Sequence, residues 1–278
     1  MGHVMKITKT PSFKAWGLAS VLALASMGVS AQTITLTNPS SQQLGGTNYL
    51  NDFNGGTTYA ASWTGAKWVS DGTSSFWAYC IDPRTGASWG TANTYTSASL
   101  ANFLTAGSPT GYAQQFASAG YTGTAYVAQN TTLVQNSLTT LFSRAYNDSL
   151  SSATKAAAFG YAVWEIMGQQ VYNRSAGLRS SGSDATYYVD GNASRDTLEV
   201  QIDAYLNALT NNAWTSVNGA NLTTTTNYVY TVYYDPAPHS AQNFIKVTTA
   251  GVPEPATLAL VGLAMLGATA ARRRTARG

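Results

Sequence analysis

The chain has 278 residues, with 15 Lys plus Arg and 12 Asp plus Glu, which give a formal net charge of +3. The two ends hold this surplus, because eight positive and eleven acidic residues between Gln32 and Gly251 leave that middle part with a net charge of −3. A nucleic-acid-binding protein needs clustered Lys and Arg on its folded part, so the distribution argues against nucleic acid as a partner. Only 10% of the residues are charged while 12% are aromatic, which argues against disorder.

Residues 1–31 have the pattern of a secretory signal peptide. A lysine-bearing start precedes an apolar run over 15–27, and small residues then precede a cleavage site between Ala31 and Gln32. The pattern predicts a signal helix that directs the chain across the inner membrane and is removed. A buried N-terminal helix is the alternative.

The C-terminal end has three parts in a fixed order. These are Val252-Pro253-Glu254-Pro255, an apolar run over 256–271, and the cluster Arg272, Arg273 and Arg274. The prolines end any preceding element. The apolar run would be about 24 Å long as a helix, a little short of the ~30 Å hydrocarbon core. The arginines would hold its end on the cytoplasmic side.

Residues 252–278 resemble the PEP-CTERM sorting signal of Gram-negative bacteria. The resemblance implies that an exosortase recognises the Pro-Glu-Pro motif, cleaves nearby and releases the protein to the cell surface or the extracellular matrix. Exosortase and the secretion machinery would then be transient partners, and the C-terminal helix would anchor the chain in the inner membrane for a time. A permanent single-span anchor is the alternative.

Cys80 is the single cysteine, so an exported chain cannot form an internal disulfide. It ends the run Phe-Trp-Ala-Tyr-Cys-Ile before Asp82-Pro83, which predicts a strand that enters a turn. On these grounds alone, Cys80 is expected to be a small buried hydrophobic residue. Whether the Cys80 thiol is free, buried or bonded is left open by the sequence.

A helix is predicted over 151–170, because Phe159, Ala162, Val163 and Ile166 follow helical spacing and Ser151 or Ser152 can cap its start. Tyr-Cys-Ile-Asp at 79–82 and Ala-Ala-Phe-Gly-Tyr-Ala-Val-Trp-Glu-Ile at 157–166 together resemble the thioester domains of bacterial surface adhesins. In that family the cysteine condenses with a glutamine side chain, releases ammonia and forms an internal thioester that can acylate amines. The resemblance would cover most of 45–250.

The chain departs from this family at the residue that should be glutamine, because Gly160 stands there and cannot supply an acyl group. Gln169 and Gln170 lie about 14 Å further along a continuous helix, too far to substitute. Cys80 and Gly160 therefore mark a thioester-like position, and Cys80 is expected to remain a free thiol. An intact thioester through another glutamine is the alternative.

The rest of the middle part alternates between strand and helix patterns. Strands are predicted over 33–37, 59–69, 75–81, 228–234 and 244–247, and helices around 134–145 and from Asp196 to Leu209, with a polar surface loop over 173–194. In the strand 228–234, Tyr228, Tyr230, Val232 and Tyr234 would share one face.

These elements predict an α+β fold, an antiparallel β-sheet with an inserted helical cluster, together with the N-terminal signal helix and the C-terminal hydrophobic helix. The expected organisation is a signal peptide at 1–31, a thioester-domain-like ectodomain at 32–250 and a sorting tail at 251–278.

No catalytic residue, metal site or cofactor is predicted. His239 and Cys80 could form a thiol nucleophile, but no signature surrounds them. Metal-binding spacings and phosphate-binding loops are missing from the sequence.

We therefore expect a non-enzymatic, exosortase-sorted surface or extracellular-matrix protein with an adhesion or biofilm-matrix role. Matrix components or exopolysaccharide are the expected partners. A secreted glycan-binding module is the first alternative, because the middle part has six tryptophans and seventeen tyrosines, which offer faces for sugar stacking. A thiol hydrolase is the second alternative.

Overall fold

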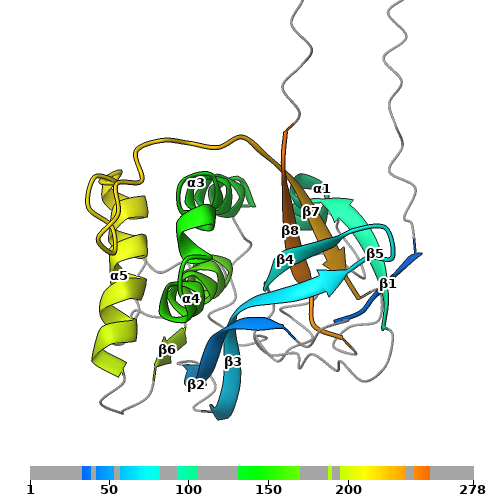
Figure 1. The fold of residues 1–278 in the computed structure, drawn as a ribbon, viewed down its shortest axis with the longest axis horizontal. Helices are drawn as coiled ribbons and strands as arrows, with labels where there is room; N and C mark the ends of the chain where they lie inside the picture. Colours follow the sequence, from blue (N-terminus) through cyan, green and yellow to red (C-terminus); the bar gives the residue numbers. More distant parts are fainter. Residues whose placement is uncertain are drawn as a thin grey trace, which may run out of the picture. The chain divides into compact units, whose positions relative to one another are not determined.

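The computed structural model describes residues 33–38, 42–52, 57–81, 93–105, 131–169, 187–189, 195–235 and 241–250. These residues form an antiparallel sheet and a group of helices, so the predicted α+β class is confirmed (Figure 1). The predicted terminal helices lie outside the described residues.

The sheet contains β1 (Thr33–Leu36), β2 (Gln43–Asp52), β3 (Thr57–Ser70), β4 (Ser75–Cys80), β5 (Asn93–Ser99), β6 (Tyr187–Val189), β7 (Tyr228–Tyr234) and β8 (Phe244–Thr249). The described helices are α1 (Leu100–Thr105), α3 (Thr131–Ser149), α4 (Ala153–Gln169) and α5 (Arg195–Asn211). These helices and the short β6 come between β5 and β7 along the chain, which is the predicted helical insertion.

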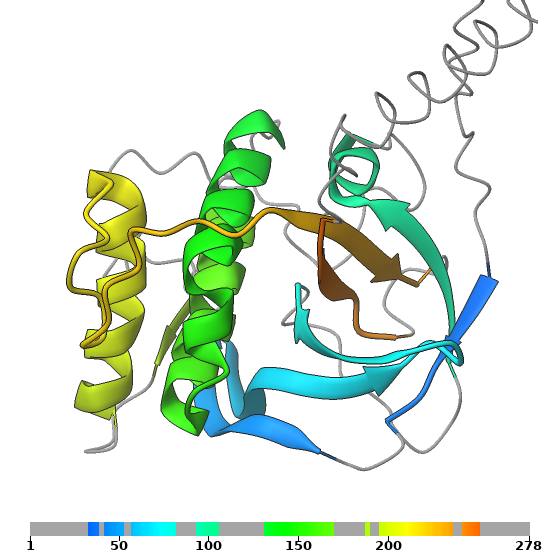
Figure 2. The same cartoon turned by 45° about the horizontal axis from the view of Figure 1, so that its top comes forward.

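The eight strands follow the order β1-β5-β7-β8-β4-β3-β2-β6, and each neighbouring pair is antiparallel. The sheet curls strongly, because Thr37 directly after β1 bridges Ser70 at the end of β3 through hydrogen bonds of 3.0 and 2.8 Å. Four strands separate β1 from β3 in the order, so the sheet has to bend round to bring them together (Figure 2).

The two faces of the sheet have different neighbours. On one face, Tyr79 and Tyr230 contact Phe142 of α3 at ring distances of 6.1 Å each. On the other face, Phe76 stacks on Tyr233 at 5.7 Å. The alternation predicted for the strand 228–234 is therefore confirmed, and it places Tyr228 and Tyr230 toward the helices.

Helix α4 is the centre of the helical layer. Every side chain from Ala156 to Met167 is buried, and the helix contacts α3, α5, β2, β3 and β4. Its start is capped as predicted, since Ser152 Oγ accepts a hydrogen bond of 3.2 Å from the Lys155 amide. The alanines and Gly160 of this helix let it approach the sheet closely, and Glu165 is its one charged side chain that is buried there.

The neighbouring helices bury the faces that their periodicity predicts. In α3 the buried side chains include Val134, Leu138, Leu141, Phe142 and Ala145. In α5 they include Leu198, Ile202, Tyr205 and Leu206. From α5 the chain runs over α3 to β7, and we call residues 212–227 the crossing segment (Figure 2).

Some of the sequence predictions need correction. The polar stretch 173–194 contains strand β6, which pairs with the far end of β2 through Leu50 and Val189. Strands β2 and β5 and helix α1 have no counterpart among the predicted elements. The glycine pair in Gln43-Leu-Gly-Gly and the many Ser and Thr of β5 hide the apolar alternation that marks a strand.

Candidate functional site

Most of the sequence-predicted sites fall outside the described residues. These are the cleavage site at Ala31 and Gln32, the sorting motif at 252–255, and the basic cluster at 272–274. His239 also lies outside them, so the Cys80–His239 pair is not tested. The structure places only Cys80 and Gly160.

Cys80 ends β4, and its side chain is only 2% exposed. Its backbone carbonyl accepts a hydrogen bond of 2.9 Å from the indole Nε1 of Trp164 in α4. The two sequence segments that carry the thioester-domain resemblance are therefore neighbours in the fold, although 84 positions separate these two residues. The burial agrees with the expectation of a buried thiol.

Gly160 lies at a close approach of α4 to β3. A Cβ atom added at this position would be 3.1 Å from the amide nitrogen of Gly65 in β3 and 3.7 Å from Cδ1 of Tyr79. The first distance is too short for an ordinary contact, and the obstacle is backbone. A side chain at Gly160 would therefore push α4 away from β3.

Lys67 is only 4% exposed, and no sequence pattern marked it as buried. Lys67 pairs with Ala78 across β3 and β4, so it shares the sheet face of Cys80 two positions further along β4. Burial lowers the pKa of Lys67, while the nearby charge of a Cys80 thiolate would raise it. Both groups are shielded from a dissolved substrate.

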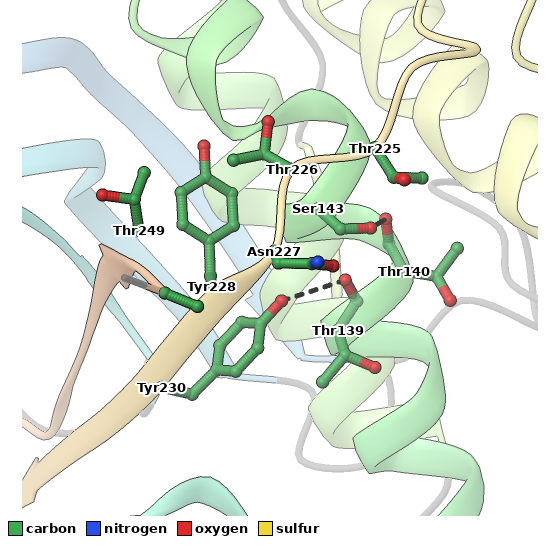
Figure 3. A pocket seen from close by; sticks show the side chains of 10 residues that line it. Thr139, Thr140, Ser143, Thr225, Thr226, Asn227, Tyr228, Tyr230 and Thr249 are labelled. Carbon is green, nitrogen blue, oxygen red and sulfur yellow. Dashed lines mark hydrogen bonds between the residues drawn. The ribbon is translucent and has the colours of Figure 1, made fainter. Parts of the chain in front are cut away.

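An open groove lies between α3, the crossing segment and the ends of β7 and β8, with a volume of about 960 Å³ (Figure 3). Its lining consists of Thr139, Thr140 and Ser143 from α3, Thr225, Thr226 and Asn227 from the crossing segment, Tyr228 and Tyr230 from β7, and Thr249 and Ala250 at the end of β8. The lining carries hydroxyl, amide and aromatic groups and no charged side chain.

The walls of the groove are held together by hydrogen bonds. The hydroxyls of Thr139 and Ser143 donate within α3, to the carbonyls of Gln135 at 2.9 Å and Thr140 at 3.0 Å, so toward a ligand they can act as acceptors. The Thr226 amide donates to the Ser143 carbonyl at 2.8 Å, and the Ala250 amide donates to the Asn227 carbonyl at 2.9 Å. The Tyr230 hydroxyl donates to the Thr139 carbonyl at 3.1 Å, which ties β7 to α3. The groove is thus a fixed feature of the fold.

Two tyrosines form the aromatic part of the groove. The rings of Tyr228 and Tyr230 lie 6.5 Å apart at 76°, and both are half-buried. Tyr228 also meets Tyr146 edge-on at 5.6 Å. Burial and the neighbouring Tyr228 raise the pKa of Tyr230 to about 12, so its hydroxyl stays protonated at neutral pH.

The four tryptophans whose side chains the structure describes are not the exposed platforms that the glycan alternative requires. Trp164 and Trp214 are buried, and Trp68 and Trp77 are half-buried against each other at 5.2 Å. The side chains of the other two lie outside the described residues. The signal for the groove was instead the alternating tyrosines of β7, preceded by the threonine run 223–226.

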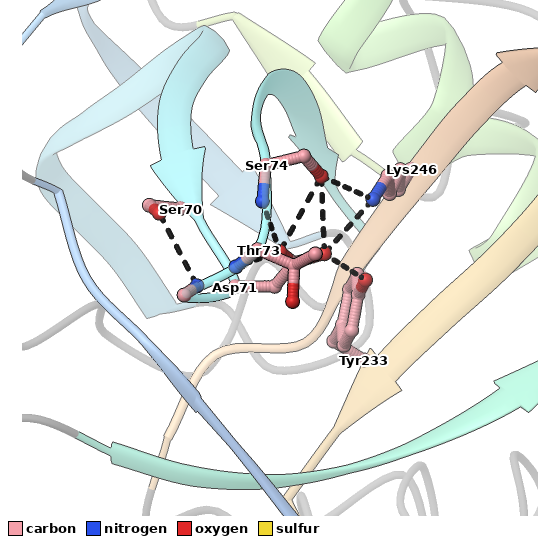
Figure 4. Close-up of polar contacts among 7 residues, drawn as sticks. Ser70, Asp71, Thr73, Ser74, Tyr233 and Lys246 are labelled. Carbon is pink, nitrogen blue, oxygen red and sulfur yellow. Dashed lines mark hydrogen bonds and ion pairs between the residues drawn. The ribbon is translucent and has the colours of Figure 1, made fainter.

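A separate polar cluster joins the β3–β4 turn to β7 and β8 (Figure 4). The Asp71 carboxylate accepts hydrogen bonds from the Lys246 ammonium at 2.9 Å, the Tyr233 hydroxyl at 3.0 Å, and the amides of Thr73 and Ser74 at 3.0 and 2.8 Å. Burial alone would raise the pKa of Asp71, but Lys246 and the other donors lower it far below its usual range. All these bonds of Asp71 are made within the protein, as expected for a residue that stabilises the fold and does not bind a ligand.

The described residues contain no group of three or more His, Cys, Asp or Glu side chains that could hold a metal ion. Within the same residues, no helix is both long and apolar enough to span a membrane. The apolar run predicted to do so, 256–271, is not among them.

Residues 251–274 match the PEP-CTERM protein-sorting motif. No curated protein and no solved structure matches the chain. The match supports an exported protein that an exosortase recognises, with a transient C-terminal membrane anchor before extracellular release. It covers the tail alone and says nothing of the middle part.

Proposed function

We propose that residues 32–250 form a non-enzymatic binding module that attaches the sorted protein to the cell surface or to the extracellular, biofilm-forming matrix. The observation that carries the proposal is the sorting motif at 251–274, because release outside the cell would bring the protein within reach of surface and matrix polymers. The polar, weakly charged composition of the middle part is suited to that role.

The burial of the reactive groups favours binding over catalysis. Cys80 is 2% exposed and Lys67 is 4% exposed, so a dissolved substrate does not reach the thiol or the amine. A nucleophile has to meet its substrate at about 3 Å, and burial prevents this. The thiol hydrolase alternative predicts an activity that Cys80→Ala abolishes, and an unchanged activity in that variant would remove it.

We further propose that the module has a thioester-domain-like scaffold without the thioester bond. The hydrogen bond from Trp164 to the Cys80 carbonyl supports the scaffold, because it joins the two segments on which the resemblance rests. The close approach of Gly160 to Gly65 supports the loss of the bond, because the backbone of β3 would have to shift by a few tenths of an ångström to admit a glutamine here.

Two measurements on the mature protein test whether the thioester bond is missing. Intact-mass analysis with thiol titration in denaturant should give the full mass of the processed chain and one titratable thiol. A mass lower by one ammonia, with a thiol that appears only after an amine is added, would contradict the missing bond.

Matrix attachment is tested separately by co-sedimentation of the mature protein with matrix extracted from the producing bacterium. The protein should pellet with the matrix and remain in solution without it. Equal amounts in the supernatant with and without matrix would overturn the binding role.

A further inference from the structure

The groove between α3, the crossing segment and β7 combines the two kinds of group that recognise a sugar ring. Half-buried tyrosine rings offer an apolar face to the C–H groups of a pyranose. Hydroxyl and amide groups can donate and accept hydrogen bonds with sugar hydroxyls. In Figure 3, Asn227 and Thr226 lie on the α3 side of the two rings, and Thr249 lies beyond Tyr228.

The size of the groove fits more than one sugar ring. Its volume of about 960 Å³ is near the upper end of the ~300–1,000 Å³ range of small-molecule sites. The groove is partly open to solvent, so a bound ligand need not be enclosed on all sides. This shape suits part of a polymer better than a single small metabolite.

The lining carries no charged side chain, which favours an uncharged ligand. A uronic acid or a sulfated sugar would bring a charge into a site that offers no cationic side chain to balance it. The nearest cation along the sequence, Arg144, is engaged with the carbonyls of Leu222 and Thr223 at 3.3 and 2.7 Å. The same lack of Lys and Arg argues against nucleic acid.

We propose that this groove binds a neutral polysaccharide, with Tyr228 as the stacking platform and the hydroxyl and amide groups around it as hydrogen-bond partners. The inference rests on the proposed attachment to the matrix and names the polymer class and the site. It places recognition at the strand ends next to the sorting tail, since Ala250 lines the groove and the sorting motif begins at residue 251.

The test uses the mature protein and calorimetric titration with neutral oligosaccharides of glucose, galactose, mannose and N-acetylglucosamine. An oligomer of uronic acid with the same number of rings is the charged comparison. At least one neutral oligosaccharide should bind, and the uronic acid oligomer should bind about tenfold more weakly or not at all. Tighter binding of the charged oligomer would overturn the proposal.

A pair of variants on β8 locates the site. Thr248 and Thr249 are both exposed and adjacent, and they point to opposite faces of the strand. Thr249→Trp should fill the groove and reduce the affinity at least about tenfold, whereas the matched control Thr248→Trp should leave it within about twofold. Equal affinities in the two variants would overturn the placement.

A second variant tests the stacking platform. Tyr228→Ala should lose about tenfold in affinity, while Tyr228→Phe should keep most of it because the ring remains. Thermal unfolding of each variant separates loss of the site from loss of the fold. Unchanged affinity in a folded Tyr228→Ala protein would contradict the role of the ring.

Parallel co-sedimentation with extracted matrix distinguishes the two proposals. If the protein pellets with matrix but no neutral oligosaccharide binds, the groove proposal fails and matrix attachment stands. If the protein does not pellet with matrix, matrix attachment fails whatever the oligosaccharides do.

Discussion

Gly160 has a hydrogen atom where other residues have a side chain, and this allows α4 to pack close to β3. The amide nitrogen of Gly65 would lie 3.1 Å from an added Cβ, and Gly65 has a φ of +125°, which disfavours any other residue there. The two glycines therefore form a backbone contact between α4 and β3 that larger residues would open.

We expect Gly160→Ala to lower the free energy of unfolding by up to about 2 kcal/mol, because overpacking against the Gly65 backbone costs about 1–3 kcal/mol and the better helix propensity of alanine offsets about 1 kcal/mol of it. Urea unfolding followed by circular dichroism measures this change. Gly160→Gln should be less stable still and should keep a free Cys80 thiol. A Gly160→Gln protein whose mass is lower by one ammonia would show that the scaffold can still close the bond.

Asp71 is expected to dominate the acid stability of the fold. Its pKa lies below the usual value of 3.8 in the native state, since burial, which opposes ionisation, is outweighed by the bonds from Lys246, Ser74, Thr73 and Tyr233. A depressed pKa stabilises the native state at pH values above 3.8, and this stabilisation is lost as the pH falls below that value toward the native pKa.

Asp71→Asn should therefore lower the free energy of unfolding at neutral pH, by about 1–3 kcal/mol, because Lys246 and Tyr233 lose a charged acceptor. The variant should also show a flatter decline of stability below about pH 4. Denaturant unfolding across this range checks both. A variant with the same acid decline as the unmodified protein would show that other carboxylates control it.

Among the larger elements, the crossing segment forms one wall of the groove and is held by α3. The Arg144 guanidinium donates to the Leu222 and Thr223 carbonyls and lies 5.4 Å from the ring centre of Trp214. The Thr226 amide adds a bond to the Ser143 carbonyl. Arg144 is thus a positioning residue for the groove and does not line it.

Replacing Arg144 by methionine keeps an aliphatic stem and removes both donations. We expect faster hydrogen exchange at the Thr226 amide and a severalfold loss of affinity for the neutral oligosaccharide. Arg144→Lys should be intermediate, because it keeps the charge without the two-pronged geometry. Unchanged exchange at Thr226 would mean that other contacts hold the segment.

The elements with strong periodicity were predictable from the sequence. Helices α3, α4 and α5 and strands β3, β4, β7 and β8 follow patterns that burial on one face imposes. Strand β2 was missed because its pairing depends on Gly45 opposite Gly65, and glycine carries no apolar signal. Strand β6 has three residues, too few for any period to appear.

The candidate site was only partly predictable. Tyrosine alternation in 228–234 placed Tyr228 and Tyr230 on one face, and the sheet confirms it. Their partner wall, Thr139 and Ser143, comes from a helix about ninety positions earlier, as the Tyr230–Thr139 bond shows. Such an assembly depends on the packing of α3 against the sheet, which no local pattern encodes. Lys67 was missed because a lysine in a strand pattern is ordinarily assigned to the solvent face.

For the whole molecule, buried tyrosines link the helices to the sheet and should set its alkaline limit. Burial is the main cause that raises the pKa of Tyr79, Tyr146, Tyr161, Tyr205, Tyr230 and Tyr233 above the ordinary value of 10.0. The native state therefore keeps protons that the unfolded chain releases above pH 10, so stability falls as the pH rises beyond that value.

We expect the buried members of this set, Tyr79, Tyr146, Tyr161, Tyr205 and Tyr233, to ionise together as the fold is lost, because burial keeps their hydroxyls from ionising in the native state. Tyrosinate absorbance during an alkaline titration should rise cooperatively, at the same pH at which near-ultraviolet circular dichroism disappears. Tyr205→Phe, which removes the hydroxyl that donates to Asp148 at 3.2 Å, serves as a comparison with one ionising group fewer. A gradual rise centred near pH 10 with the circular dichroism unchanged would show that these hydroxyls reach solvent in the folded protein, and that the layer of rings between helices and sheet is looser than their contacts imply.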